Sequence, residues 1–443
     1  MSSSKSPSRS IDREAPVQGA VVIHPDREGR NAWREAEARL EEAVGLALAL
    51  DLEVRETLIA TLRHLTPATL FGKGKVEEIG KLIELADADV AIVDDSLTPV
   101  QQRNLEKAWQ VKVIDRTGLI LEIFARRART REGRLQVELA RLSYERSRLV
   151  RTWTHLERQR GGFGVMGGPG ETQIETDRRL LADRIGKLKR ELTEVRRTRT
   201  LQRSARKRHP YPMVALVGYT NAGKSTLFNR LTNAEVVAED MLFATLDPTL
   251  RMLKLPDGRP AILSDTVGFI SDLPHELVEA FRATLEEVKE ADVVLHVRDI
   301  ASDESAAQAG DVRMVLERLD VDMEDRSILE VWNKLDLLPN DDREIVEGDA
   351  RRAHPPAIPL SAVTGEGCAE LLEAIAALVD EAPAVDVFTP VGEGAAIAWL
   401  YRHGRVLERR DGKDGSVRLA VSLSAQALGQ FEQQFPGAEV RGN

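Results

Sequence analysis

Short apolar runs alternate with amphipathic stretches over residues 19–128. Three runs are apolar without a helical period: residues 20–23, 89–93 and 111–114. The stretches between them, such as 32–50 and 75–86, carry apolar residues every three or four positions. Strands that alternate with helices predict a parallel or mixed α/β domain over 19–128. The polar, serine-rich residues 1–18 before it are expected to form a disordered tail.

The apolar period changes over residues 129–208. Two series of apolar residues step by three, four and seven positions, which is the spacing of a heptad seam. The two series are Leu135, Leu139, Leu142, Leu149, Trp153 and Leu156, then Ile174, Leu181, Ile185, Leu188, Leu192 and Val195. A glycine-rich break at 161–170 separates them, so we predict a long antiparallel helical hairpin with a glycine-rich tip. The tip exposes Phe163 and Met166; a flexible surface turn is the alternative interpretation.

Two prolines after the hairpin mark the next boundary. Pro210 and Pro212 stop the preceding helix, because proline lacks the N–H that a helix needs. The segments that follow are a second α/β region (211–381), a proline-bearing linker (382–394) and a small α+β domain (395–443). In the last of these we predict a strand at 416–422 and a helix at 424–433. The fold class is therefore α/β, with a small α+β domain at the C-terminal end.

The composition restricts the class of protein. At 443 residues the chain exceeds what one core usually organises, and 42% hydrophobic with 30% charged residues is typical of folded domains. The single cysteine, Cys368, excludes an internal disulfide and suits a reducing compartment. No apolar run approaches the roughly 20 residues that span a bilayer, and residues 440–443 lack a prenylation cysteine. We expect a monomeric cytoplasmic protein without a membrane anchor, which leaves only peripheral membrane association open.

Charge is distributed unevenly along the chain. The net charge is -10, but residues 125–210 carry 24 Lys and Arg against 10 Asp and Glu. A basic segment inside an acidic protein predicts a polyanionic partner at that segment. A solvated arginine-rich helix is the alternative, and it explains the excess less well because acidic residues do not balance it.

One stretch has the spacing of a phosphate-binding loop, or P-loop. It consists of Gly218, Tyr219, Thr220, Asn221, Ala222, Gly223, Lys224 and Ser225, between an apolar run at 214–217 and a helical pattern that reaches Leu231. The glycines let the backbone fold around a phosphate with its N–H groups inward, and the helix N-terminus adds positive potential. Lys224 is predicted to reach the β- and γ-phosphates of a nucleotide, and the Ser225 hydroxyl to bind Mg²⁺.

A second stretch predicts which base is bound. Asn333, Lys334, Leu335 and Asp336 follow an apolar run at 328–332, and ligands bind at the carboxyl ends of strands in such sheets. The Asp336 carboxylate can accept hydrogen bonds from the ring N1–H and the exocyclic amine of guanine, whereas adenine has an acceptor at N1. Asn333 can serve N7, and the Lys334 stem can cover the base plane. A loop of Ser361, Ala362 and Val363 lies where GTPases close on the guanine carbonyl.

An Asp-x-x-Gly motif lies between these two stretches and consists of Asp265, Thr266, Val267 and Gly268. Its aspartate is predicted to hold Mg²⁺ through water, and its glycine amide to contact the γ-phosphate of GTP. Upstream, the segment Phe243, Ala244, Thr245, Leu246 and Asp247 supplies Thr245 as the second Mg²⁺ hydroxyl. Switch regions are then expected at 237–250 (switch I) and 267–276 (switch II), with Lys224, Thr245 and Gly268 in catalytic roles.

The residue after the Asp-x-x-Gly motif is Phe269. GTPases of the Ras type place a glutamine there to orient the attacking water, and a phenyl ring cannot do this. We therefore expect slow intrinsic turnover that rises when a partner orders the site or a monovalent cation enters. Asn221 occupies the position where potassium-dependent GTPases place a cation-ligating asparagine, so K⁺ is the expected cation beside Mg²⁺.

Three motifs together resemble the HflX-type translational GTPases. They are residues 218–225 with 243–249, the glycine-rich signature at 168–179, and Gly-Lys-Gly-Lys-Val-Glu-Glu at 72–78. The resemblance runs from Val21 to Glu381. It implies an N-terminal α/β domain with a long hairpin, a Ras-like GTPase domain, binding to the large (50S) ribosomal subunit and splitting of stalled ribosomes. The basic hairpin would then bind rRNA phosphates, and Phe163 and Met166 would insert among bases.

The glycine-rich tip departs from the family pattern, because Val165 and Met166 stand where many members have an arginine. The resemblance also implies ATP binding by the N-terminal domain, with residues 72–75 as a phosphate contact. No adenine-reading motif accompanies them, so a tight turn is the favoured interpretation. Two other functions stay open: a GTP-switched assembly factor of the large subunit, and an ATP-driven RNA-remodelling enzyme, which Asn333 and Asp336 disfavour.

Overall fold

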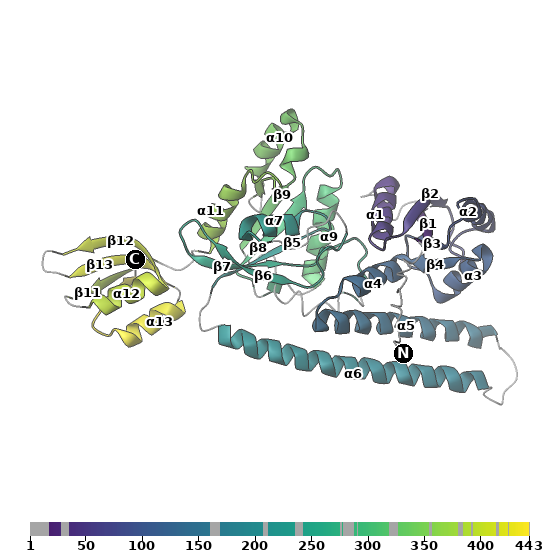
Figure 1. Ribbon diagram of the computed structural model, residues 1–443, viewed down its shortest axis with the longest axis horizontal. Helices are drawn as coiled ribbons and strands as arrows, with labels where there is room; N and C mark the ends of the chain where they lie inside the picture. Colours follow the sequence, from purple (N-terminus) through teal and green to yellow (C-terminus); the bar gives the residue numbers. More distant parts are fainter. Residues whose placement is uncertain are drawn as a thin grey trace, which may run out of the picture. The chain divides into compact units, whose positions relative to one another are not determined.

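The computed structural model describes residues 17–27, 35–159, 169–206, 211–234, 242–274, 277, 288–289, 291–318, 327–353, 357–379, 384–390, 393–412, 416–423 and 425–442. The chain divides into two compact units. The first holds Met1–Leu253 and Ala261–Gly367, and the second holds Lys254–Pro260 and Cys368–Asn443. Figure 1 labels their helices and strands.

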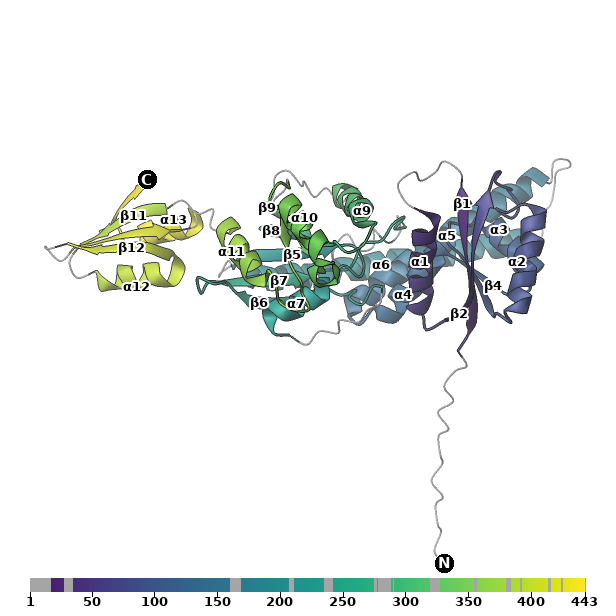
Figure 2. The same cartoon turned by 90° about the horizontal axis from the view of Figure 1, so that it is seen from above.

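The first unit begins with a four-stranded parallel sheet. Its strands are β1 (Gly19–Arg27), β2 (Glu53–Leu62), β3 (Val90–Val93) and β4 (Lys112–Asp115), in the order β2-β1-β3-β4. The connecting helices are α1 (Ala36–Leu48), α2 (Lys73–Leu85) and α3 (Pro99–Trp109), and α4 (Arg116–Arg127) follows β4. Figure 2 shows α1 and α4 on one face of the sheet and α2 and α3 on the other. The predicted α/β alternation is confirmed.

Side chains are buried on both faces of this sheet. On one face Val22 packs in a cluster with Leu46 of α1 and Phe124 of α4. On the other face Val21 packs in a cluster with Ile79 of α2. Two-sided burial explains why β1 and β3 are unbroken apolar runs in the sequence. The sequence pattern does not predict β2, because this edge strand has exposed polar residues that interrupt the apolar run.

Helices α5 (Arg131–Gln159) and α6 (Pro169–Arg206) form the predicted hairpin. Leu135, near the start of α5, packs in a buried cluster with Leu188 and Leu192 of α6, so the two helices are antiparallel. The seam residues Leu139, Leu142 and Val195 pack against the same cluster. Phe163 and Met166 of the tip lie outside the described residues, as do the side chains of Leu149, Trp153, Leu156 and Ile174. Within the described chain no helix, these two included, is long and apolar enough to cross a membrane.

The second sheet of this unit has the order β10-β9-β8-β5-β7-β6. Its strands are β5 (Met213–Gly218), β6 (Thr249–Lys254), β7 (Pro260–Asp265), β8 (Val293–Asp299), β9 (Ser327–Asn333) and β10 (Ala357–Pro359). Its helices are α7 (Lys224–Thr232), α9 (Ser305–Arg318), α10 (Asn340–Ala350) and the 3-10 helix η1 (Leu335–Leu337). The strand pairs from β10 to β7 are parallel, so their carboxyl ends meet at one edge of the sheet. The P-loop, Asp265 and Asn333 all stand at that edge.

The second unit contains α11 (Cys368–Leu378) and an antiparallel sheet of order β12-β13-β11-β14. Its other elements are β11 (Ala384–Thr389), α12 (Gly394–His403), β12 (Arg405–Asp411), β13 (Val417–Ser422), α13 (Ala425–Gln434) and β14 (Glu439–Gly442). The strand and helix predicted at 416–422 and 424–433 are confirmed as β13 and α13. The linker predicted at 382–394 is wrong, because β11 lies inside the sheet. Val385, Val387 and Thr389 of β11 are buried at every second position, which is the pattern of a strand with one covered face.

Candidate nucleotide-binding site

The P-loop connects the end of β5 to the start of α7. Asn221 and Gly223 have positive φ angles of 59° and 89°, which bring the chain back over the N-terminus of α7. A side chain on Gly223 would collide with the amide nitrogen of Asn333, so this position requires glycine for space as well as for its backbone angle.

The P-loop forms one wall of a pocket. The lining residues are Thr220, Asn221, Gly223, Lys224, Ser225, Thr226, Phe243, Ala244, Thr245, Thr266 and Gly268. The structure therefore brings together P-loop, switch I and Asp-x-x-Gly residues that the sequence motifs assign to one nucleotide site. Thr226 is the residue in this set that the motifs miss, because the P-loop pattern ends at Ser225.

Lys224 is a buried lysine in the lining of this pocket. Its Nζ donates hydrogen bonds to the carbonyl oxygens of Gly218, at 3.1 Å, and Tyr219, at 2.6 Å. Burial lowers the pKa of Lys224 to about 8, and the carboxylate of Asp265 opposes this shift. A buried ammonium group needs a compensating negative charge, which the phosphates of a nucleotide would supply.

Three oxygen-bearing side chains converge beside Lys224. The Ser225 Oγ lies 2.7 Å from Asp265 Oδ2 and 2.8 Å from Thr245 Oγ1, and Thr245 Oγ1 lies 3.0 Å from the same carboxylate oxygen. The other carboxylate oxygen, Oδ1, is buried without a hydrogen-bond partner in the described structure, and burial raises the pKa of Asp265. Hydroxyl and carboxylate oxygens gathered at a buried carboxylate that keeps one oxygen unpaired suit Mg²⁺, which prefers oxygen ligands. The predicted metal residues Ser225 and Thr245 thus lie together.

Asn333, at the end of β9, joins two loops of the site. Its Nδ2 donates to the carbonyl oxygen of Ala222 in the P-loop at 2.8 Å, and its Oδ1 accepts from the N–H of Ala362 at 2.9 Å. The side chain therefore fixes the P-loop against the loop of residues 361–363. The sequence motif assigns Asn333 only to the N7 of guanine and does not indicate this second role.

The remaining guanine-side residues lie around this junction. Asp336 is half-buried in η1, and its carboxylate has no hydrogen-bond partner among the described residues. The Lys334 Nζ forms an ion pair with Asp299 at 2.7 Å. Arg230 of α7 donates to the carbonyl oxygens of Ala362, at 3.1 Å, and Val363. No motif predicts Arg230, because it acts on the backbone of the loop from another element.

The five residues of the segment 243–247, within the predicted switch I, divide into two groups. Phe243, Ala244 and Thr245 line the pocket, whereas Leu246 is buried in the hydrophobic core. The Asp247 carboxylate accepts hydrogen bonds from the backbone N–H groups of Arg129 and Thr130, at 2.9 and 2.8 Å, just before α5 begins. Its side chain therefore contacts the base of the hairpin and does not line the pocket, and its assignment to the nucleotide site stays a prediction.

Phe269 is buried among core residues and is 1% exposed. Its backbone pairs with the P-loop: the Thr220 N–H donates to the Phe269 carbonyl at 2.7 Å, and the Phe269 N–H donates to the Gly218 carbonyl at 3.1 Å. Gly268 consequently lies so close to the P-loop that a Cβ would come within 2.9 Å of the Thr220 Cα. Phe269 therefore takes part in this site through its backbone, which pairs with the P-loop, and not through its side chain, which is buried in the core.

Residues 72–75 begin helix α2. Gly72 is the N-cap, Lys73 is the first helical residue, and Lys75 forms an ion pair with Glu78 at 2.8 Å. The tight turn that the sequence favours is therefore the start of a helix, where glycine is one of the accepted N-cap residues.

Four family models match successive parts of the chain. They are described as GTP-binding GTPase N-terminal (residues 37–125), GTP-binding GTPase middle region (127–206), 50S ribosome-binding GTPase (213–334) and HflX C-terminal domain (348–440). The GTPase HflX of Magnetococcus marinus is 53% identical over 408 residues, which are 91% of this chain and 92% of that protein. The chain belongs to the HflX family of GTPases.

A further relative agrees with this assignment. The GTPase HflX of Escherichia coli K12 is 44% identical over 385 residues, covering 87% of this chain and 89% of that protein. Among solved structures, the GDP complex of SsGBP is 26% identical and covers 82% of this chain and 98% of that one, with a TM-score of 0.47. As an HflX-family member with a P-loop GTPase domain, the protein is a GTP-hydrolysing enzyme.

Proposed function

We propose that this HflX-family GTPase binds the large (50S) ribosomal subunit and splits or rescues stalled ribosomes. The basic hairpin of α5 and α6 contacts ribosomal RNA, and GTP hydrolysis resets the protein. The observation that carries the proposal is the contact between switch I and the hairpin at Asp247, because it joins the nucleotide pocket to the basic arm. The matched family description, a 50S ribosome-binding GTPase, supports the choice of partner.

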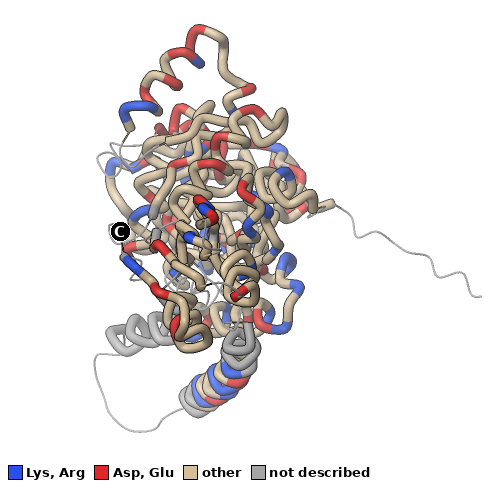
Figure 3. The backbone as a smooth tube through the Cα atoms, turned by 90° about the vertical axis from the view of Figure 1, so that its left-hand side faces the viewer, with Lys and Arg blue, Asp and Glu red and all other residues tan. Residues whose placement is uncertain are grey.

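Exposed basic side chains support binding of the hairpin to RNA. Those of α6 with a described exposed position are Arg178, Arg179, Arg184, Lys187, Lys189, Arg190 and Arg197. Figure 3 shows blue Lys and Arg positions along the described part of this helix. Phosphate groups of RNA would release counterions on binding such a surface, which makes affinity fall as salt rises. Insertion of Phe163 and Met166 among bases is part of the proposal, although both lie outside the described residues.

The reaction would use the side chains of the pocket in the roles that the motifs assign. Asp336 would read guanine, and Ser225, Thr245 and Asp265 would hold Mg²⁺. Bound Mg²⁺ neutralises charge that develops on the phosphates during hydrolysis. Lys224 and the amide of Gly268 stabilise the same charge from the protein side.

The contact at Asp247 connects switch I to the base of the hairpin, so GTP hydrolysis could change the position of the hairpin. Asp247 is two residues beyond the Mg²⁺ ligand Thr245, so reordering of switch I after loss of the γ-phosphate would move both residues together. Its carboxylate sits at the N-terminus of α5, where free N–H groups and the helix dipole stabilise negative charge. The base of the hairpin would therefore respond to the nucleotide state.

Replacing Asp247 with alanine should uncouple the nucleotide site from the hairpin. We expect stimulation of GTP hydrolysis by 50S subunits to fall by about tenfold, because hydrogen bonds to a charged group contribute about 1.5–3 kcal/mol each. GDP affinity should stay near the wild-type value, since the side chain faces the hairpin. Thr130→Ala is the matched variant, because Thr130 Oγ1 bonds the same carboxylate from the hairpin side. Full 50S stimulation in both variants would show that this contact does not transmit the signal.

Replacing Lys187 and Lys189 with alanine tests the hairpin surface. We expect weaker binding to 50S subunits and a smaller dependence of log affinity on log salt concentration, by about one unit per lost phosphate contact. Binding measured at several KCl concentrations checks both quantities. The double variant Arg351→Ala/Arg352→Ala removes two exposed charges just after α10 and should leave the salt dependence unchanged. An equal effect of the two double variants would contradict a specific role for the hairpin.

Potassium is a proposed activator, because Asn221 is exposed at the pocket and held in the left-handed backbone conformation. We expect kcat for GTP to be higher in KCl than in NaCl, and Asn221→Ala to abolish the difference. Equal kcat in both salts for the wild-type protein would show that K⁺ does not activate GTP hydrolysis.

A GTP-switched assembly factor of the large subunit would share the GTPase site and the basic hairpin. Sedimentation of intact ribosomes after incubation with the protein and GTP separates the two functions. Ribosome splitting predicts that the 70S peak declines while subunit peaks grow. A 70S peak that stays whole, with protein bound to free 50S subunits, would favour the assembly factor.

A further inference from the structure

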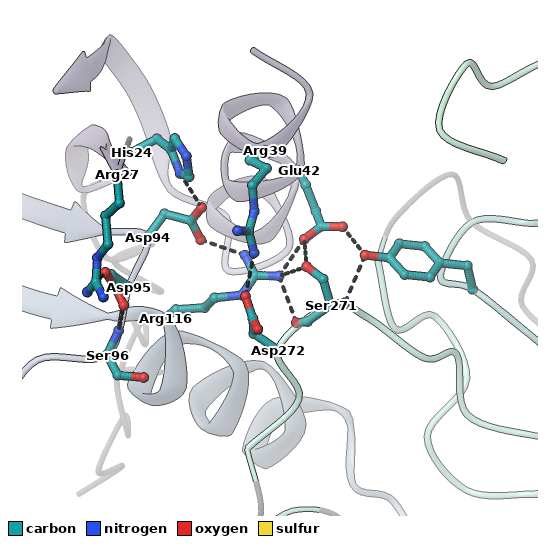
Figure 4. A network of polar contacts seen from close by, with 11 residues as sticks. His24, Arg27, Arg39, Glu42, Asp94, Asp95, Ser96, Arg116, Ser271 and Asp272 are labelled. Atoms are coloured by element: carbon teal, nitrogen blue, oxygen red, sulfur yellow. Dashed lines mark hydrogen bonds and ion pairs between the residues drawn. The ribbon is translucent and has the colours of Figure 1, made fainter. Parts of the chain in front are cut away.

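A carboxylate from the N-terminal domain contacts both the P-loop and switch II. Glu42 of α1 accepts hydrogen bonds from the Tyr219 hydroxyl and from Ser271 Oγ, the latter at 2.8 Å. It also pairs with Arg116, the first residue of α4. The side chains of Glu42 and Arg116 are only 10% and 5% exposed. Figure 4 shows Glu42 and Arg116 converging on Ser271.

The polar group formed by Glu42, Arg116 and Tyr219 fixes the backbone of switch II at Ser271. The Ser271 N–H donates to the Tyr219 hydroxyl at 2.8 Å, and Arg116 donates to the Ser271 carbonyl at 3.1 Å and to its Oγ at 2.9 Å. Two residues earlier, Phe269 is paired with the P-loop backbone. Switch II is thus held at two points immediately after Gly268, and Tyr219 contributes to the second from inside the P-loop.

Arg116 is itself fixed from the N-terminal sheet. It donates to Asp94 at 2.5 Å, and Asp94 lies 2.8 Å from the Nδ1 of His24. His24 and Asp94 stand where the central strands β1 and β3 stop pairing, at the carboxyl edge of the sheet. In doubly wound sheets a ligand usually binds at such a position. Here the position receives residues 271–272 of switch II, with Arg39 of α1 paired to Asp272.

The charges in this group make its geometry costly to alter. A buried carboxylate is unfavourable unless it is paired and hydrogen-bonded, and Glu42 is paired with the Arg116 guanidinium and accepts from the hydroxyls of Tyr219 and Ser271. Removing its charge would leave Arg116 undercompensated beside Ser271. The position of Ser271 therefore depends on the charge and acceptor capacity of Glu42.

We propose that Glu42 is a positioning residue for GTP hydrolysis, which acts through Tyr219 and Ser271 on the backbone amide of Gly268. That amide is assigned to the γ-phosphate, so its placement matters for GTP and the transition state but not for GDP. Since Phe269 offers no side-chain hydrogen bond to water, catalysis relies strongly on main-chain geometry. A small displacement of a catalytic group can cost about 10²-fold in rate. The inference requires GTP hydrolysis and does not depend on the ribosome.

The test compares Glu42→Gln, Tyr219→Phe and their double variant in the full-length protein without ribosomes. Each single change should lower kcat for GTP by about tenfold, the scale of one hydrogen bond, and weaken binding of a non-hydrolysable GTP analogue. GDP affinity should stay within about twofold of wild type, because GDP does not reach Gly268. The double variant should lose little more than either single one, since both changes break the same path. Glu41→Gln, at the exposed neighbouring position of α1, is the matched control and should hydrolyse GTP normally.

Several outcomes overturn the proposal. An unchanged or raised kcat in Glu42→Gln would mean that the carboxylate does not support catalysis. Equal losses of GDP and GTP-analogue affinity would mean that the residue only maintains the fold. If Glu42→Gln does not yield folded protein, Tyr219→Phe alone decides, because it removes only the hydroxyl that connects Glu42 to the Ser271 N–H; wild-type kcat in that variant rejects the path.

Discussion

Replacing Lys224 with alanine should lower the rate of GTP hydrolysis by at least about 10²-fold, the scale found when one transition-state donor is removed. Lys224 is buried in the pocket lining, and its Nζ is held by two P-loop carbonyl oxygens. No other lysine or arginine is among the residues that line the described pocket, so nothing there replaces its charge.

The measurement is single-turnover hydrolysis of GTP at saturating Mg²⁺, which separates the chemical step from nucleotide affinity. Lys81→Ala, at an exposed position of α2, is the control and should retain the wild-type rate. A Lys224→Ala protein that hydrolyses GTP at a rate close to wild type would place the chemistry elsewhere.

Replacing Asp336 with asparagine should weaken GTP binding by about 10²- to 10⁴-fold, since two hydrogen bonds to a charged acceptor contribute about 1.5–3 kcal/mol each. The carboxylate has no partner among the described residues, so it is open to the N1–H and amine of guanine. Asparagine offers a donor in place of one acceptor, which suits the carbonyl that xanthine has in place of that amine.

Binding of GDP and xanthosine diphosphate to both proteins measures the change. The variant should prefer the xanthosine nucleotide, and Asp341→Asn, at an exposed position of α10, should keep the preference for GDP. If the Asp336 variant still prefers GDP as strongly as the wild type, guanine is read by other residues.

The parts of the site that follow from sequence are those in which spacing alone determines the chemistry. The P-loop needs its glycines at fixed positions to turn back over α7, so the spacing of the motif is sufficient to assign Gly223 and Lys224. The hairpin follows from its heptad period in the same way, as the cluster of Leu135, Leu188 and Leu192 shows.

Contacts between segments that are far apart in the sequence produce no periodic pattern or fixed spacing from which they could be predicted. Glu42 and Ser271 are 229 residues apart, and neither lies in a recognisable motif. Asp247 belongs to a motif, yet its partner is the backbone of Arg129 and Thr130, which any sequence would provide. Asn333 likewise binds the backbone of Ala222 and Ala362, so its role in holding the loops depends on the fold rather than on the sequence of its partners.

Two strands, β2 and β11, are not predicted from the sequence for a related reason. The sequence does not predict β11, because Pro383 and Pro390 suggest a linker, although Val385 and Val387 alternate as a half-buried strand should. The sequence does not predict β2 either, because this edge strand has polar residues at its exposed positions. In both cases the position of the strand in its sheet determines the pattern, and that position is a tertiary property.

The rate of GTP hydrolysis with and without purified 50S subunits tests the central claim most directly. The measurement uses full-length protein at fixed Mg²⁺, KCl and ionic strength, with subunits washed free of other GTPases. We predict a stimulation of at least about tenfold, because partners that complete a GTPase site can reach factors of about 10³ or more. A rate that stays the same at saturating 50S concentration would contradict a ribosome-dependent GTPase.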